Sequence, residues 1–180
     1  MLGKDIQSLK KVIEMTKELL LALFIVVWVN SFIISHTKVP TESMLPTISP
    51  GNHLFVNRMP YYYRDPKRGE VVVFTHGDNH MIKRVIGLPG DEINIIEDQV
   101  YINGKKLDET QYILEDAKTY IFAGSKITYP YIVPENCYFV MGDNRINSSD
   151  SRVFGPIPRK DIIAKAGVRV LPFDEMGWIN

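Results

Sequence analysis

The 180-residue sequence has one cysteine, no net charge and no long run of charges of a single sign. Cys137 cannot form an intramolecular disulfide, and its apolar neighbours are typical of a buried small side chain rather than a reactive thiol. The balance of 21 basic and 21 acidic residues provides no electrostatic footprint for nucleic acid, so we expect no nucleic-acid partner. Hydrophobic residues make up 45% of the chain, which is enough for a packed core and excludes a disordered chain.

One stretch lacks charge altogether, because residues 19–35 read LLLALFIVVWVNSFIIS. As a helix it would span roughly 25 Å, near the lower limit for a hydrocarbon core about 30 Å thick. Four lysines lie ahead of this run, at positions 4, 10, 11 and 17, whereas only Lys38 follows closely. The positive-inside rule therefore predicts a cytoplasmic segment at 1–18, a transmembrane helix at 19–35 in a cell membrane, and an extracytoplasmic domain at 36–180.

Two other interpretations of this run remain open. A cleaved secretory signal peptide also has a basic start and an apolar centre, although no Ala-x-Ala follows the run. A helix buried in a protein core would show an amphipathic stripe, which this run lacks. We favour an uncleaved single-pass anchor that contacts the lipid bilayer.

Beyond residue 35, short β-branched and aromatic runs separated by Gly, Pro, Asn and Asp predict a mainly β fold, with an all-β domain after the helix. The predicted strands are 54–57, 70–75, 81–86, 92–97, 99–102, 119–122, 138–141 and 162–170. The pair Asn103-Gly104 is typical of a hairpin turn that needs positive φ at both positions. Residues 107–135 carry no motif, and we interpret them as a variable insertion on the β core.

A proline-rich segment, VPTESMLPT at 39–47, follows the apolar run. Pro40 and Pro46 restrict the backbone on either side of Ser43, which favours a stiff loop suited to a nucleophile. The same serine could instead cap the turn ahead of Pro46.

A second cluster, HMIKRVIGLPGD at 80–91, places Lys83 among apolar neighbours. Strand alternation points Lys83 and Arg84 to opposite faces, so one cation can be buried while the other meets solvent or an acidic partner. Burial lowers the pKa of a lysine amine, which gives a general base able to take a proton from a serine hydroxyl. The alternative is a lysine at the sheet edge with its ammonium in water.

A third cluster, GDNRINSSDSR at 142–152, is dense in groups that pair charges and hydrogen-bond the backbone. It could be only a well-capped loop. It could also orient a base, with Asp150 pairing an arginine and a serine hydroxyl holding the lysine amine.

Together, these three clusters behind an apolar N-terminal run resemble the bacterial type I signal peptidases. The family patterns S-M-x-P-T, K-R-V-x-G-x-P-G-D and G-D-N-R-x-N-S-x-D-S-R occur at 43–47, 83–91 and 142–152, and RGEVVVF at 68–74 matches a further family segment. The resemblance implies a membrane-anchored serine endopeptidase that removes signal peptides from exported preproteins after Ala-x-Ala-like sites. It implies no metal and no other cofactor.

The resemblance also implies a role for each matching residue. Ser43 would be the nucleophile and Lys83 the general base, with the Thr41 hydroxyl and the Ser43 N–H forming an oxyanion hole. The supporting residues would be Ser148, which hydrogen-bonds the lysine, and the charged Asp150, Arg152 and Arg84. Substrate would bind as a strand added between 39–41 and 80–82, where three apolar side chains line shallow pockets, namely Val39, Met44 and Ile82.

This chain departs from the family pattern at two positions. Ile146 stands where family members commonly carry Asp, and Thr41 keeps a hydroxyl while adding a methyl group to the Ser that many members have. Neither departure removes Ser43 or Lys83, so we expect an active enzyme.

Three rival interpretations stand beside this one. A Ser-His-Asp hydrolase would use one of four histidines, but none lies in a G-x-S-x-G elbow. A zinc site at His76, Asp78 and His80 would rest on a loose spacing. The third rival is an anchored β domain that binds exported proteins without cutting them, and nothing in the sequence specifies an oligomeric state.

Overall fold

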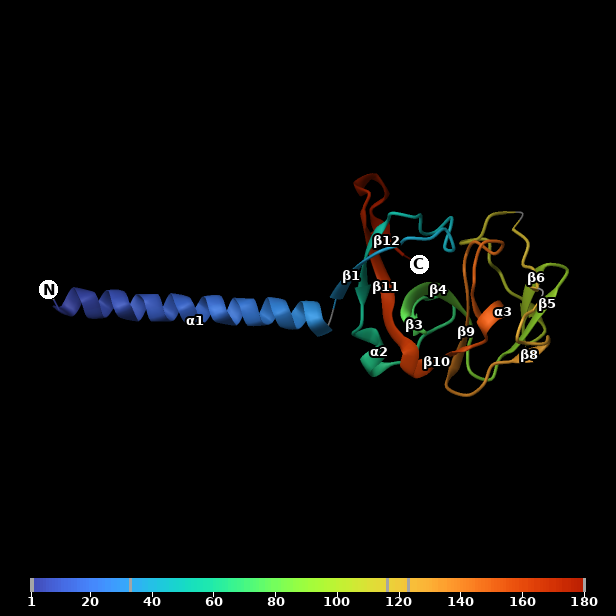
Figure 1. Ribbon diagram of the computed structural model, residues 1–180, viewed down its shortest axis with the longest axis horizontal. Helices are drawn as coiled ribbons and strands as arrows, with labels where there is room; N and C mark the ends of the chain where they lie inside the picture. Colours follow the sequence, from blue (N-terminus) through green and yellow to red (C-terminus); the bar gives the residue numbers. More distant parts are fainter. Residues whose placement is uncertain (1, 33, 116, 123, 180) are drawn as a thin grey trace.

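The computed structural model describes residues 2–32, 34–115, 117–122 and 124–179. A long N-terminal helix, α1 at Leu2–Phe32, extends from a mainly β domain (Figure 1), and the predicted β fold beyond the helix is confirmed. The other helices are single turns, α2 at Pro60–Tyr63, α3 at Ser151–Phe154, and the 3₁₀ turns η1 at Arg159–Asp161 and η2 at Phe173–Glu175.

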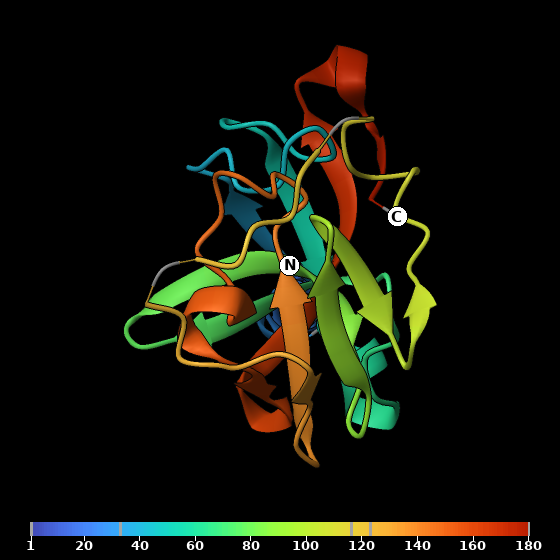
Figure 2. The same cartoon turned by 90° about the vertical axis from the view of Figure 1, so that its right-hand side faces the viewer.

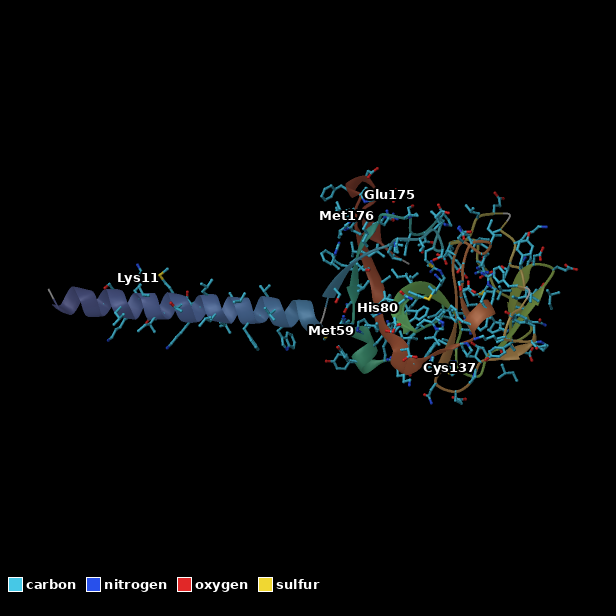
Figure 3. The ribbon with its side chains drawn as sticks, viewed as in Figure 1. Lys11, Met59, His80, Cys137, Glu175 and Met176 are labelled. Atoms are coloured by element: carbon cyan, nitrogen blue, oxygen red, sulfur yellow. The ribbon has the colours of Figure 1, made fainter. Side chains whose placement is uncertain are left out.

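The helix α1 joins the polar start of the chain and most of the apolar run in one element. Its large apolar side chains from Leu19 to Trp28 are between 47% and 69% exposed. Figure 3 shows that Lys11 and its neighbours project from α1 well away from the β domain. Within the described ranges, no helix is both long enough and apolar enough to cross a membrane.

The helix predicted for 19–35 is too long at its C-terminal end. α1 stops at Phe32, and the strand β1 occupies Ile34–Lys38. Ile34 and Ser35 are paired with Asn57 and Val56 of the neighbouring strand, so the ladder of a sheet replaces helical hydrogen bonds there.

The larger sheet contains eight antiparallel strands in the order β1-β2-β11-β3-β4-β9-β10, with β12 paired to β11. The bounds not yet given are β2 at His53–Asn57, β3 at Val71–His76, β4 at Asn79–Gly87, β9 at Cys137–Met141, β10 at Ile157–Pro158, β11 at Ile162–Leu171 and β12 at Gly177–Trp178. The predicted strands at 54–57, 70–75, 81–86, 138–141 and 162–170 all fall within or beside these elements.

A second sheet, in the order β7-β6-β5-β8, lies at the end of the molecule farthest from α1 (Figures 1 and 2). Its strands are β5 at Glu92–Ile96, β6 at Gln99–Ile102, β7 at Lys105–Lys106 and β8 at Tyr131–Ile132. Asn103 and Gly104 have φ of 51° and 75° and connect β6 to β7, which confirms the predicted hairpin.

Alternation along β3 divides the interior into two cores, because successive side chains of a strand point to opposite faces. Val71 and Val73 join the core that contains Met44, whereas Val72 and Phe74 join a core with strands β4 and β9. A third core lies under the second sheet. Burial of each such side chain contributes about 1.5–3 kcal/mol of folding free energy. The apolar residues of β4 pack in these cores, so the strand that carries Lys83 is held in place.

The strand predicted at 119–122 is wrong. The Thr119 N–H donates to the carbonyl of Asp98 at 2.9 Å, and the Thr119 hydroxyl accepts from Arg145 at 2.9 Å. The Tyr120 carbonyl accepts from Arg152 at 3.3 Å. The Arg152 side chain therefore takes a backbone hydrogen-bonding position, at the Tyr120 carbonyl, that a strand neighbour would occupy.

Candidate active site

Ser43 and Lys83, which are 40 positions apart in sequence, lie side by side in the structure. The Lys83 Nζ donates to Ser43 Oγ at 2.6 Å and to the carbonyl oxygen of Ile82 at 3.0 Å. Ser43 lies in the turn between β1 and β2, and Lys83 lies in the middle of β4. Only 8% of Ser43 and 3% of Lys83 are exposed. The two residues predicted to react together are thus brought into direct contact.

The turn that holds Ser43 is fixed by its neighbours. Met44 and Ile48 are fully buried, and the Ile48 N–H donates to the Met44 carbonyl at 2.8 Å. The Leu45 N–H donates to the Glu42 carbonyl at 3.1 Å, which closes the turn around Ser43. The Thr41 hydroxyl lies 3.3 Å from Ser43 Oγ, so the hydroxyls of both predicted residues are adjacent.

Burial changes the acid–base behaviour of the lysine. Desolvation is the largest influence and lowers the pKa of Lys83 to about 8, aided by Arg152 and opposed by Asp150 and Asp143. With that pKa, roughly one Lys83 in ten is neutral at pH 7, against fewer than one in a thousand for an ordinary lysine. The side chain can therefore accept a proton near neutral pH.

Arg84, the next residue of β4, forms a buried ion pair. Its Nε and Nη2 donate to the two oxygens of Asp143 at 2.8 and 2.7 Å, and its Nη1 donates to the Gly69 carbonyl at 2.7 Å. The guanidinium also lies 4.2 Å from the centre of the Tyr112 ring. The sequence left open whether the second cation would meet solvent or an acidic partner, and Arg84 has the acidic partner, Asp143.

Asp150 and Arg152 form a second buried pair, and neither is exposed. Two guanidinium nitrogens donate to the carboxylate at 2.9 and 2.8 Å, and the Gly142 N–H donates to it at 3.0 Å. The predicted pairing of Asp150 with an arginine is confirmed. Through the Gly142 N–H, the pair connects the first residue of the third cluster to Asp150 and Arg152 at its C-terminal end.

The hydrogen bond predicted between Ser148 and Lys83 is not formed in this structure. Ser148 is 6% exposed, and its Oγ has no hydrogen-bond partner within the described residues. The two hydrogen bonds that the Lys83 amine donates go to Ser43 Oγ and to the Ile82 carbonyl.

The three apolar residues predicted to contact substrate lie together. Val39 and Met44 belong to the first core, and Ile82 packs against it. Met44 is fully buried and Val39 is 3% exposed, so of the three only Ile82 has a substantial accessible surface. Val39 and Met44 are therefore part of the core next to Ile82, and Ile82 is the one of the three that substrate can contact most readily.

Sequence reasoning missed a third buried pair beside the site. Arg145 donates to both oxygens of Glu109, once at 3.0 Å, and also to the Gly142 carbonyl at 3.1 Å. Glu109 belongs to the segment 107–135, in which no motif marks it. The available signal was Arg145, a charged residue of the third cluster to which no partner had been assigned.

The two histidines of the rival zinc site have other contacts. The His76 ring stacks on Phe154 with centroids 4.2 Å apart, and His80 Nδ1 lies 3.4 Å from the Thr75 hydroxyl. In the part of the chain that is described, no group of three or more His, Cys, Asp or Glu side chains could hold a metal ion.

Comparison with known proteins decides the family. The sequence model of the family described as "Signal peptidase, peptidase S26" matches residues 12–171. The chain belongs to this family. As a signal peptidase it is a serine peptidase that cleaves signal peptides from preproteins, and the resemblance drawn from the three clusters is confirmed.

Individual relatives of this signal peptidase match over most of their length. It is 36% identical to Signal peptidase I S of Bacillus subtilis (strain 168) over 184 residues, covering 100% of both chains. It is 38% identical to Signal peptidase I of Bacillus amyloliquefaciens over 169 residues, covering 92% of this chain and 91% of that one. A crystal structure of a signal peptidase I from Enterococcus faecalis V583 is 33% identical, with a TM-score of 0.47 and coverage of 57% of this chain and 97% of that one.

Proposed function

We propose that this signal peptidase cuts through a Ser43–Lys83 dyad. The observation that carries the proposal is the 2.6 Å contact between the Ser43 hydroxyl and the buried Lys83 amine, whose pKa burial lowers to about 8. The neutral amine takes the hydroxyl proton while Ser43 Oγ attacks the scissile carbonyl, and the resulting ammonium protonates the leaving amine. Water activated by the same amine then hydrolyses the acyl-enzyme ester and restores Ser43.

The oxyanion of the tetrahedral intermediate is assigned to the Ser43 N–H and the Thr41 hydroxyl. Thr41 Oγ1 lies 3.3 Å from Ser43 Oγ, so it is within reach of the oxygen of a carbonyl that Ser43 attacks. Each donor aimed at a developing oxyanion stabilises the transition state by about 2.7–4 kcal/mol.

Substrate binding as an added strand is supported by the pairing of β4. The strand β3 pairs with β4 from Asn79 to Arg84, whereas β9 pairs with β4 only from Arg84 onward. Residues 80–82 are therefore paired on one side, and a substrate strand along their other side would pass next to Lys83. Val39 and Met44 are buried and apolar, and the Ala-x-Ala sites that we propose as substrates present small apolar side chains to this part of the site.

Membrane attachment through the apolar part of α1, residues 19–32, with 1–18 in the cytoplasm and the β domain from β1 onward outside, is the second part of the proposal. The run contains no charged residue, and lysines precede it. The exposed apolar side chains from Leu19 to Trp28 form a surface larger than soluble monomers usually display. A lipid bilayer is the partner that matches this chemistry.

Cleavage of a preprotein with an Ala-x-Ala site by the detergent-solubilised full chain tests the dyad. We expect a cut after the second alanine, located by mass spectrometry, and a loss of roughly 10⁴-fold or more in kcat for Ser43→Ala and for Lys83→Ala. Lys118→Ala, which removes an exposed lysine, is the matched control and should cut normally. Full activity of Lys83→Ala would favour a histidine base, and a folded wild type that cuts nothing would favour a binding protein.

A further inference from the structure

Asn144 holds the turn of the nucleophile at two successive carbonyl groups. Its backbone N–H donates to the Ser43 carbonyl at 3.1 Å, and its side-chain Nδ2 donates to the Glu42 carbonyl at 3.1 Å. These two carbonyls flank the Ser43 side chain, so one residue of the third cluster fixes the backbone on both sides of Ser43.

The Glu42 carbonyl accepts from Asn144 Nδ2 and from the Leu45 N–H, both at 3.1 Å, and these two bonds set where the Ser43 N–H points. The Glu42 carbonyl and the Ser43 N–H belong to one planar peptide unit, which is trans, so the two groups point in opposite directions. Rotation of that unit would turn both groups together. A hydrogen bond that fixes the Glu42 oxygen therefore also fixes the direction of the Ser43 N–H.

The neighbours of Asn144 give it a rigid base. Asp143 accepts two hydrogen bonds from Arg84, and Arg145 donates to both oxygens of Glu109. Asp143 and Arg145 are each 1% exposed. Asn144 thus lies between two residues that are anchored by buried ion pairs, which limits the movement of its backbone.

A second asparagine in the same loop has a different contact. Asn147 Nδ2 donates to the Glu42 carboxylate oxygen Oε2 at 3.3 Å, so its side chain touches the exposed side chain of Glu42 and not the peptide unit. The two residues share their chemistry, their loop and their partner residue. They differ in one respect: the Asn144 hydrogen bond is made to the peptide unit that contains the Ser43 N–H, and the Asn147 hydrogen bond is not.

We propose that Asn144 is a positioning residue that aims the Ser43 N–H at the oxyanion of the tetrahedral intermediate. This inference rests on the proposed function of Ser43 as nucleophile and oxyanion donor. Asn144 touches no reacting atom, and its contribution is realised only when negative charge develops on the substrate oxygen.

Steady-state kinetics of the full chain in detergent tests this role. For Asn144→Ala and Asn144→Asp, which both remove the Nδ2 donor, we expect kcat to fall by about 10-fold to 100-fold with KM unchanged. The Asp variant keeps the shape of the side chain, so it guards against misfolding of the Ala variant. Asn147→Ala, the matched control, should stay within about twofold of the wild type.

A peptide aldehyde and an uncleavable peptide of the same sequence separate positioning from a general loss of binding. Ser43 Oγ adds to the aldehyde carbon, the C=O π electrons move to the oxygen as an oxyanion, and the hydroxyl proton moves to Lys83. In both Asn144 variants, aldehyde affinity should fall by the same factor as kcat/KM, whereas affinity for the uncleavable peptide should not change. The pH midpoint of kcat/KM should also stay at the wild-type value.

The possible results are distinct. An Asn144→Asp enzyme with wild-type kcat, or one that loses both peptides equally, would overturn the role of Asn144 while leaving the dyad intact. If kcat fell by the same factor in Asn147→Ala, the effect would come from the loop in general and not from the hydrogen bond to the Glu42–Ser43 peptide unit, and the role of Asn144 would be overturned. Undiminished cleavage by Ser43→Ala would instead overturn the proposed function on which the inference depends.

Discussion

At the scale of single residues, the environment of Lys83 sets the pH range of activity. Because the base must be neutral, and burial lowers the pKa of Lys83 to about 8, kcat/KM should rise with pH through about 8 and level off above it. The neutral form dominates above the pKa, which fixes the sign. Initial rates on a soluble peptide from about pH 6 to about pH 10 measure the profile.

The same profile should be found for Lys118→Ala, because the Lys118 side chain is exposed and its amine pairs with Asp98 and not with the dyad. A rate that falls as the pH rises from 6 to 9 would mean that the essential group is an acid, and Lys83 could then not be the base.

At the scale of elements, the segment 107–119 supports the active site through Glu109. Replacing Glu109 by Gln leaves the guanidinium of Arg145, 1% exposed, without a charged partner. Removal of one partner of a buried ion pair costs about 3–5 kcal/mol, so Glu109→Gln should lower the free energy of unfolding by about 3 kcal/mol. Denaturant unfolding of the detergent-solubilised chain, followed by the near-ultraviolet circular dichroism of buried tyrosines such as Tyr61 and Tyr138, measures this change.

The exposed pair of Asp98 and Lys118, 3.7 Å apart, supplies the comparison for that experiment. Asp98→Asn should change the stability by less than about 1 kcal/mol, as for most surface pairs. Equal effects of the two substitutions would show that Glu109 contributes no more than a surface charge.

Among the elements, those with local sequence signals could be predicted and those that depend on distant partners could not. Strands with local alternation, and the turn at Asn103-Gly104, were predicted because their signals lie within a few adjacent residues. The end of α1 and the missing strand at 119–122 were not, because each depends on a partner distant in sequence. Ser43 and Lys83 were predicted from motifs, whereas Glu109 has no motif and became visible only through its contact with Arg145.

At the scale of the whole molecule, α1 is the element that we propose to hold the enzyme in the bilayer. Replacing Leu23 and Phe24 by Asp would place two charges in the uncharged run, each costing about 2.5–3.5 kcal/mol in a membrane. The double variant should lose most of its flotation with phospholipid vesicles while it still cleaves a soluble peptide. Leu9→Asp, on the polar part of the same helix, should float as the wild type does.

If the double variant floated normally, the run 19–35 would not be the anchor. If it lost peptide cleavage as well, α1 would contribute to the fold of the β domain beyond attachment.

The short connection between α1 and the nucleophile has a kinetic consequence. Ser43 lies eleven positions after Phe32 in the sequence, a reach of at most roughly 38 Å. On the proposed placement, enzyme and preprotein share one thin layer at the membrane surface, where tethering gives an effective concentration of roughly millimolar order. Recognition of two small side chains then needs little intrinsic affinity. Weak, permissive binding lets one enzyme process many preproteins and release each product quickly.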